Sequence, residues 1–127
     1  TKMRHHVAGF KLGRSKDHRR NLRRVMISQL FTHERIRTTM AKAKAIRGEA
    51  ERLITLARNS QDGSDVDKVN ARRQAAAKLG NPEIVRKLFD DIGPRYTDRN
   101  GGYTRLFRLE PRLGDQAEMA LLELIEE

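Results

Sequence analysis

The fold is decided by the stretch at residues 40–58, which reads MAKAKAIRGEAERLITLAR. Its apolar residues recur at steps of three and four, the spacing that places side chains on one face of an α-helix. They are Ala43, Ile46, Ala50, Leu53, Ile54 and Ala57. Thr39 precedes the stretch and belongs to the residue types that cap helices through a side-chain oxygen. We therefore expect an amphipathic core helix from Met40 to Arg58.

Two shorter elements are expected before this helix. Residues 34–39 contain Ile36 and two threonines, which favour a brief strand. Residues 17–31 place apolar side chains at helical spacing, at Leu22, Val25, Met26, Leu30 and Phe31. The opposite face of this helix is expected to carry Arg19, Arg20, Arg23 and Arg24. Such a helix would pack one side against the core and present the other to phosphate groups.

Two further helices are expected after the core helix. Turn-forming residues at 59–65 indicate a surface loop. An alanine-rich helix is expected at 66–79, with Gly80 at its end. The next helix is bounded by residues typical of helix ends, Asn81 and Pro82 at its start and Gly93 and Pro94 at its end.

The C-terminal part of the chain indicates a β-hairpin. Residues 103–109 are rich in strand-forming types, and the breakers at 110–115 indicate a turn. Residues 117–125 consist mostly of Ala, Leu, Met and Glu, which favour a helix by propensity alone. Because propensity is the weaker argument when a strand partner is available, we expect a second strand here.

Length and composition limit the classes of protein. The 127 residues amount to one domain of ordinary size. The lack of cysteine excludes disulfides and thiol catalysis and fits a reducing, cytosol-like compartment. No apolar run approaches the roughly 18 residues that cross a bilayer. With four Phe, two Tyr and no Trp, the chain offers little surface for stacking several unpaired bases.

The net charge of +10 is concentrated near the N-terminus. Residues 1–24 hold nine basic residues and one acidic residue, whereas residues 83–127 hold seven basic and ten acidic residues. Binding to a polyphosphate favours such an arm, because each neutralised phosphate releases counterions. A solvated tail and a membrane-surface arm are the alternatives. We expect residues 1–16 to form a basic RNA-binding extension and residues 17–127 to form a single α+β domain.

Two groups of candidate RNA-binding residues follow from this distribution. The first would bind phosphates and comprises Arg4, Lys11, Arg14, Lys16, Arg19, Arg20, Arg23 and Arg24. Histidines in the same segment are expected to donate hydrogen bonds to RNA or to be tail residues without a role, since the neighbouring arginines repel a metal cation; they are His5, His6 and His18. The second group lies at the N-terminus of the core helix, an end that favours phosphate, and comprises Thr38, Thr39, Lys42 and Lys44.

A third group lies in the sequence RYTDRNGGYTR at residues 95–105. Arginines, tyrosines and paired glycines there offer phosphate, stacking and close backbone contacts to RNA. The candidates are Arg95, Tyr96, Arg99, Gly101, Gly102, Tyr103 and Arg105. In the alternative interpretation this segment only leads into the hairpin, and its glycines serve the turn.

No arrangement of residues points to catalysis. The acidic residues are scattered over loops, helix ends and the C-terminal segment, whereas acid catalysis needs paired carboxylates in a cleft. No glycine-rich phosphate-binding motif occurs. We expect no enzymatic activity, no cofactor, no bound metal and no small-molecule substrate.

Several motifs resemble the bacterial-type family of large-subunit ribosomal protein seventeen. In the N-terminal half they are Met3-Arg4-His5, Gly9, Leu12-x-Arg14, His33-Glu-x-Ile36-x-Thr38-Thr39-x-x-Lys42-Ala43-Lys44 and Glu51-x-Leu53-Ile54-Thr55-x-Ala57-Arg58. In the C-terminal half they are Leu88-Phe89, Gly93-Pro94-Arg95-Tyr96, Gly101-Gly102-Tyr103-Thr104-Arg105 and Gly114-Asp115-x-Ala117-x-Met119-Ala120. The resemblance runs in order from Met3 to about Ile125. The sequence departs from the family pattern in a longer loop at 61–68 and in Thr1 and Lys2 before the usual starting methionine.

The resemblance implies an α+β fold with about four helices on a small three-stranded mixed sheet and an extended basic N-terminal arm. The implied strands are 34–39, 103–109 and 117–124. It also implies a structural constituent of the large ribosomal subunit that binds large-subunit ribosomal RNA, supports translation, and lies near the peptide exit region beside other ribosomal proteins. The expected location is cytoplasmic, and an organellar ribosome is left open. The alternative function is that of a free-standing, non-ribosomal nucleic-acid-binding protein.

Overall fold

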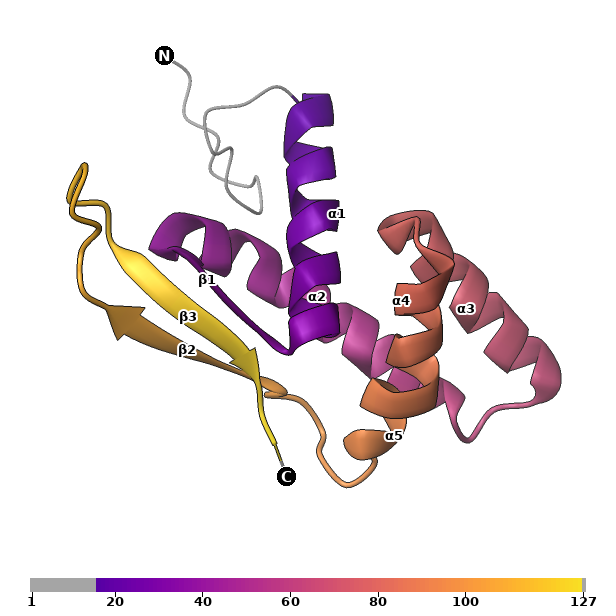
Figure 1. The fold of residues 1–127 in the computed structure, drawn as a ribbon. Helices are drawn as coiled ribbons and strands as arrows, with labels where there is room; N and C mark the ends of the chain where they lie inside the picture. Colours follow the sequence, from indigo (N-terminus) through magenta and orange to yellow (C-terminus); the bar gives the residue numbers. More distant parts are fainter. Residues whose placement is uncertain (1–15, 127) are drawn as a thin grey trace, which may run out of the picture.

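The computed structural model describes residues 16–126, which form an α+β domain as expected (Figure 1). The elements follow in the order α1 (Lys16–His33), β1 (Arg35–Thr39), α2 (Met40–Ser60), α3 (Asp65–Leu79), α4 (Pro82–Lys87), the π-helix η1 (Leu88–Ile92), α5 (Gly93–Arg95), β2 (Thr104–Leu109) and β3 (Met119–Leu124). The sheet lies at one side of the molecule, α3 and α4 lie at the other, and α1 and α2 lie between them. In this part of the chain, no helix combines the length and the apolar character needed to cross a membrane.

Helix α2 is the centre of the fold. Each of the six apolar residues expected on its inner face is buried: Ala43, Ile46, Ala50, Leu53, Ile54 and Ala57. They belong to one hydrophobic core to which α1, α3, the helix from Pro82 to Arg95 and the sheet also contribute. The Thr39 side chain accepts a hydrogen bond from the backbone N–H of Lys42 at 3.3 Å, which confirms the expected helix cap.

The sheet is antiparallel throughout and is not the mixed sheet that the resemblance implied. Its strand order is β1-β3-β2, and β3 pairs antiparallel with both neighbours. Strands β1 and β2 run in the same direction, but β3 lies between them, so no parallel ladder forms.

Strand β3 forms although its sequence, MALLEL, favours a helix by propensity. Its backbone pairs on both sides, and Ala120, Leu122 and Leu124 are buried against the core. Pairing and burial outweigh propensity here, which confirms the predicted strand. It begins at Met119, two residues later than expected, because the Ala117 carbonyl accepts a turn hydrogen bond from the Arg112 N–H at 2.9 Å.

The stop of α3 at Gly80 and the cap of α4 at Asn81 are those that the sequence indicated, whereas the cap at the start of α3 was not expected. Ser64 and Asp67 form a reciprocal capping box at the start of α3. Gly80 ends α3 in the left-handed conformation, with φ of 70°. Asn81 then caps α4 by accepting a hydrogen bond from the Glu83 N–H at 2.9 Å.

The helix that begins at Pro82 does not stop at Gly93 and Pro94, contrary to expectation. It continues through η1 into α5 and ends at Arg95. The Gly93 N–H donates to the Leu88 carbonyl, five residues back, which is the hydrogen bond of a π-turn. This wider turn relieves the clash that Pro94 would make with the preceding turn of an α-helix.

Gly93 is required because α5 lies directly against α2. A Cβ atom at this position would lie 3.0 Å from the Ala57 Cβ and 3.1 Å from the Ala57 carbonyl carbon. We expect Gly93→Ala to lower the free energy of unfolding by about 1–3 kcal/mol, since overpacking exceeds the helix preference for alanine. Urea denaturation would measure this loss. Gly114→Ala is the control, because a Cβ there meets nothing within 4 Å; equal stability of the two variants would contradict the close packing.

Candidate nucleic-acid interface

The predicted RNA-binding residues fall partly outside the residues that the structure describes. The part outside comprises Arg4, His5, His6, Lys11 and Arg14. The remaining candidates lie on α1, at the junction of β1 and α2, and in the segment between α5 and β2.

Helix α1 separates its charged and apolar residues along its axis. Full burial begins at Met26; before it Leu22 is half-buried against the core, and Val25, which was expected in the core, is 52 % exposed. The predicted arrangement of arginines opposite the apolar stripe is therefore wrong, because residues seven positions apart share one side of a helix. Such steps join Arg20 with Ile27, Arg23 with Leu30, and Arg24 with Phe31. The side of α1 that carries arginines in the N-terminal half is therefore the same side that is buried in the C-terminal half.

This N-terminal half extends beyond the core (Figure 1). Lys16, His18 and Arg20 are exposed, and Arg19 is half-buried. Asp17 is the helix's one acidic residue. Among residues 16–126, no carboxylate forms an ion pair with Lys16 or Arg20. Their charges are therefore available to an external anion.

Arg24 has a structural role within the domain. Its Nε donates to the Lys78 carbonyl at 3.1 Å and its Nη2 to the Ala77 carbonyl at 3.3 Å. These carbonyls belong to the last turn of α3, where the carbonyl groups have no N–H donor within the helix and a cation is favoured. Arg24 therefore joins α1 to α3, and its guanidinium is partly used by that contact.

The second group lies at the start of α2, as the sequence indicated. The Thr39 hydroxyl is used as the helix cap. Thr38 and Lys42 are half-buried, whereas Lys44 is exposed. Lys44 is thus the most accessible member of this group.

The two tyrosines of the third group are core residues. The exposed fraction is 0 % for Tyr96 and 1 % for Tyr103, and their ring centroids lie 5.1 Å apart. The Tyr96 hydroxyl donates to the Ile125 carbonyl at 2.5 Å, and the Tyr103 hydroxyl lies 3.2 Å from Thr55 Oγ1. Burial raises the pKa of Tyr96. In this structure neither ring offers a face on which a base could stack.

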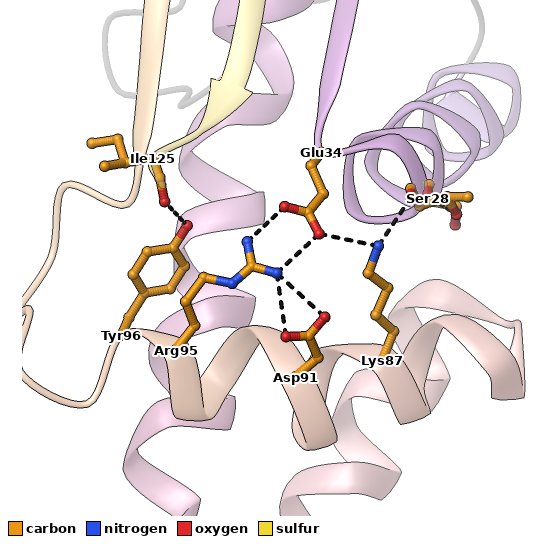
Figure 2. Close-up of polar contacts among 8 residues, drawn as sticks. Ser28, Glu34, Lys87, Asp91, Arg95, Tyr96 and Ile125 are labelled. Atoms are coloured by element: carbon orange, nitrogen blue, oxygen red, sulfur yellow. Dashed lines mark hydrogen bonds and ion pairs between the residues drawn. The ribbon is translucent and has the colours of Figure 1, made fainter. Parts of the chain in front are cut away.

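Arg95 belongs to an ion-pair cluster that joins α1, β1 and the last helix (Figure 2). Its Nη1 and Nη2 donate to the two carboxylate oxygens of Glu34 at 2.6 and 2.9 Å, and Nη2 also contacts Asp91 at 3.3 Å. Lys87 lies 3.3 Å from Glu34 and donates to the Thr32 carbonyl at 3.0 Å. The Arg95 guanidinium holds the pKa of Glu34 at about 2, well below its ordinary value of 4.5.

The paired glycines have a conformational role. Gly101 and Gly102 have φ of 116° and 61°, values that side-chain-bearing residues rarely adopt. Arg99 Nη1 donates to the Gly102 carbonyl at 3.2 Å, and Arg105 forms an ion pair with Glu123 at 3.3 Å. These features support the interpretation of the segment as the lead-in to the hairpin.

Thr104 anchors this segment to α2, a contact that sequence reasoning missed. Glu51 Oε2 accepts hydrogen bonds from the Thr104 N–H at 3.0 Å and from its hydroxyl at 2.7 Å. Arg47 Nε donates to the Thr104 hydroxyl oxygen at 3.1 Å. The sequence feature that could have indicated this contact is the pair Arg47 and Glu51, four residues apart and next to the apolar stripe of the core helix.

The third group lies apart from the other two groups. Helix α1 has 18 residues and is about 27 Å long. The third group contacts Glu34, at the C-terminal end of this helix, whereas the exposed cations lie at its N-terminal end. The five residues of β1, about 17 Å, separate Glu34 from the second group. The geometry therefore separates the third group from the other two and leaves the N-terminal half of α1 and the start of α2 as the described parts of the candidate interface.

Residues 22–125, from within α1 to the end of the sheet, match the model of ribosomal protein L17. The chain belongs to the ribosomal protein L17 family. The family expected from the sequence is thereby confirmed.

Bacterial members of the ribosomal protein L17 family match nearly the whole chain, and each relative named here carries the name large ribosomal subunit protein bL17. The relative in Trichlorobacter lovleyi is 48 % identical over 125 residues, which are 98 % of this chain and 95 % of that protein. The relative in Chloroflexus aurantiacus is 50 % identical over 123 residues, covering 97 % of this chain and 100 % of its own. The relative in Solibacter usitatus is 50 % identical over 123 residues, covering 97 % and 77 %.

Proposed function

We propose that the chain binds large-subunit ribosomal RNA through phosphate contacts from the N-terminal half of α1 and from the basic extension at residues 1–16. Family membership makes the chain a structural constituent of the large ribosomal subunit, and not an enzyme. The proposal concerns the part of the chain that makes the RNA contact.

The observation that carries the proposal is the contrast between α1 and the remaining basic surface. Lys16 and Arg20 are exposed and form no ion pair among residues 16–126. Some arginines elsewhere on the domain have carboxylate partners, as in the pairs Arg72–Asp90, Arg108–Glu118 and Arg112–Asp115, and others, such as Arg73 and Arg86, lie apart from one another in the sequence. The N-terminal half of α1 instead places five Lys and Arg residues beside a single acidic residue, so it can neutralise several neighbouring phosphates and is the better phosphate-binding surface.

The remaining candidates contribute to the proposal to different degrees. Lys44 and Lys42 would supply a secondary phosphate contact at the start of α2. Four residues of the third group are exposed or half-buried and would contribute backbone and side-chain contacts to RNA at the margin of the interface: Arg99, Gly101, Gly102 and Arg105. Tyr96, Tyr103 and Arg95 are excluded from the proposed contact because their side chains are used inside the domain.

The proposed setting also follows from the family. A site near the peptide exit region of the large subunit, beside other ribosomal proteins, is consistent with the resemblance stated above. We place the chain in a cytoplasmic ribosome, with an organellar ribosome as the alternative.

Gradient sedimentation of a cell lysate tests this function. We expect the full chain to remain with large subunits after a moderate-salt wash, because several phosphate contacts act together. Treatment with ribonuclease is the control and should release the chain to the top fractions. Recovery in the top fractions without ribonuclease would instead support a free-standing nucleic-acid-binding protein.

A further inference from the structure

One face of the sheet carries apolar side chains that the proposed RNA contact does not use. In β3 every second residue is buried and faces the helices, namely Ala120, Leu122 and Leu124. The intervening residues therefore lie on the opposite, outer face. The strand register brings four apolar side chains together there, and we name them the outer patch: Phe107, Leu109, Met119 and Leu121.

The outer patch is accessible to a partner. Phe107 is 43 % exposed, and the other three residues of the patch are half-buried. Within residues 16–126, the helices pack on the other face of the sheet, against Leu122 and its neighbours. Clustered exposed apolar residues on a sheet face are typical of interaction surfaces.

The charged residues around the patch are partly neutralised. Glu123 lies between two arginines and is only 12 % exposed, with Arg35 Nη2 at 3.2 Å and Arg105 Nη2 at 3.3 Å. The Arg105 guanidinium also lies 5.8 Å from the centre of the Phe107 ring. Arg37, which pairs in register with Leu121, is exposed and has no ion-pair partner among the described residues. The face therefore carries three arginines and one carboxylate, and Arg37 is the arginine without a carboxylate partner next to the apolar surface.

We propose that the outer patch docks a neighbouring protein of the large subunit, through a polypeptide segment with apolar side chains and one carboxylate that meets Arg37. This inference rests on the function proposed above, since it places the partner in the same particle. The apolar side chains of the partner cover Phe107 and Leu121, and its carboxylate forms the ion pair that Arg37 lacks within the described residues.

Two features favour a polypeptide over RNA at this face. The patch contains an aromatic residue and Met, is bordered by arginine and not by lysine, and so resembles the centre of protein interfaces in composition. A phosphate chain would pair with Arg37 but would gain nothing from the aliphatic side chains of Leu121 and Met119. RNA contact is therefore assigned to α1, and protein contact to the outer patch.

Site-specific photo-crosslinking in purified large subunits tests the docking. The variant Phe107→p-benzoylphenylalanine adds bulk at an exposed position and keeps the aromatic ring. After irradiation we expect an adduct with a ribosomal protein, whose crosslinked peptide, identified by mass spectrometry, contains apolar residues and an Asp or Glu. A nuclease-sensitive adduct with RNA, or no adduct in subunits that contain the variant, would overturn the proposal.

A second pair of variants measures the strength of the contact. We expect Phe107→Ser to bind free ribosomal RNA like the unaltered chain and to leave assembled subunits about tenfold faster, as for the loss of an interface anchor. Val66→Ser is the matched control, because Val66 is also an exposed apolar residue, at 67 %, but lies on α3. Equal release rates for the two variants would contradict docking at the patch. Failure of the unaltered chain to enter large subunits would instead overturn the proposed function.

Discussion

Replacing Lys16 and Arg20 together by glutamine should weaken binding to large-subunit ribosomal RNA by about a hundredfold. Both side chains are exposed and uncompensated within the described chain. A hydrogen bond to a charged group contributes about 1.5–3 kcal/mol, so losing two corresponds to a factor of about a hundred or more. The slope of log K against log salt concentration should also become shallower by about 2. Filter binding of the full chain to ribosomal RNA across a salt series measures both quantities.

The matched control is Arg73→Gln with Arg86→Gln. This variant loses the same net charge from two exposed arginines on α3 and α4. We expect its affinity to fall only a few-fold, because its arginines lie on other helices, outside the proposed phosphate contacts, and act through screened attraction. Equal losses in the two double variants would mean that overall charge governs binding. Thermal unfolding should be unchanged in both, since none of the four side chains contributes to the core.

The helices and the hairpin were predictable because local signals and core packing agree there. The apolar stripe of α2, the Thr39 cap and the stop at Gly80 each depend on residues close in sequence. The continuation of the last helix beyond Gly93 was not predictable in this way. It depends on contact with Ala57 on α2, which lies far away in the sequence.

The candidate site was predicted less well than the fold, for two physical reasons. Residue type alone does not separate a tyrosine that stacks on RNA from one buried in a core, and Tyr96 is buried because its partner, the Ile125 carbonyl, comes from the end of the sheet. The apolar stripe of α1 was also interpreted as running its whole length. In the structure full burial begins at Met26, with only Leu22 half-buried against the core before it, so the same side of the helix is basic in the first half and buried in the second.

Glu34 occupies an unfavourable backbone conformation that its side-chain contacts stabilise. It directly follows α1 and has φ of 67°, a value that costs about 1 kcal/mol or more for a residue with a Cβ. Its N–H donates to the Leu30 carbonyl at 2.7 Å, and its own carbonyl accepts from the Leu124 N–H at 2.9 Å. The carboxylate meanwhile binds Arg95 with both oxygens. One residue therefore connects the end of α1, the sheet and the last helix.

We expect Glu34→Gln to lower the free energy of unfolding by about 2–3 kcal/mol at neutral pH. The pKa of Glu34 is about 2 in the folded protein, against an ordinary value of 4.5, and this difference corresponds to about 3 kcal/mol in favour of the folded state. Partial exposure of the pair, at 30 % for Glu34 and 20 % for Arg95, reduces this value somewhat. Chemical denaturation of both proteins measures the difference.

The same pair predicts how the difference depends on pH. Above about pH 5, Glu34 is ionised in the folded and the unfolded chain, so the stabilisation by Arg95 is fully present. As the pH falls, the unfolded chain takes up a proton first, and the stabilisation is lost by about pH 2. The stabilities of the unaltered protein and of Glu34→Gln should therefore converge between pH 5 and pH 2. Asp90→Asn is the control: it removes the exposed pair with Arg72 and should change stability by less than about 1 kcal/mol. A constant difference between the unaltered protein and Glu34→Gln across this range would show that Glu34 acts through its shape and backbone, and not through its charge.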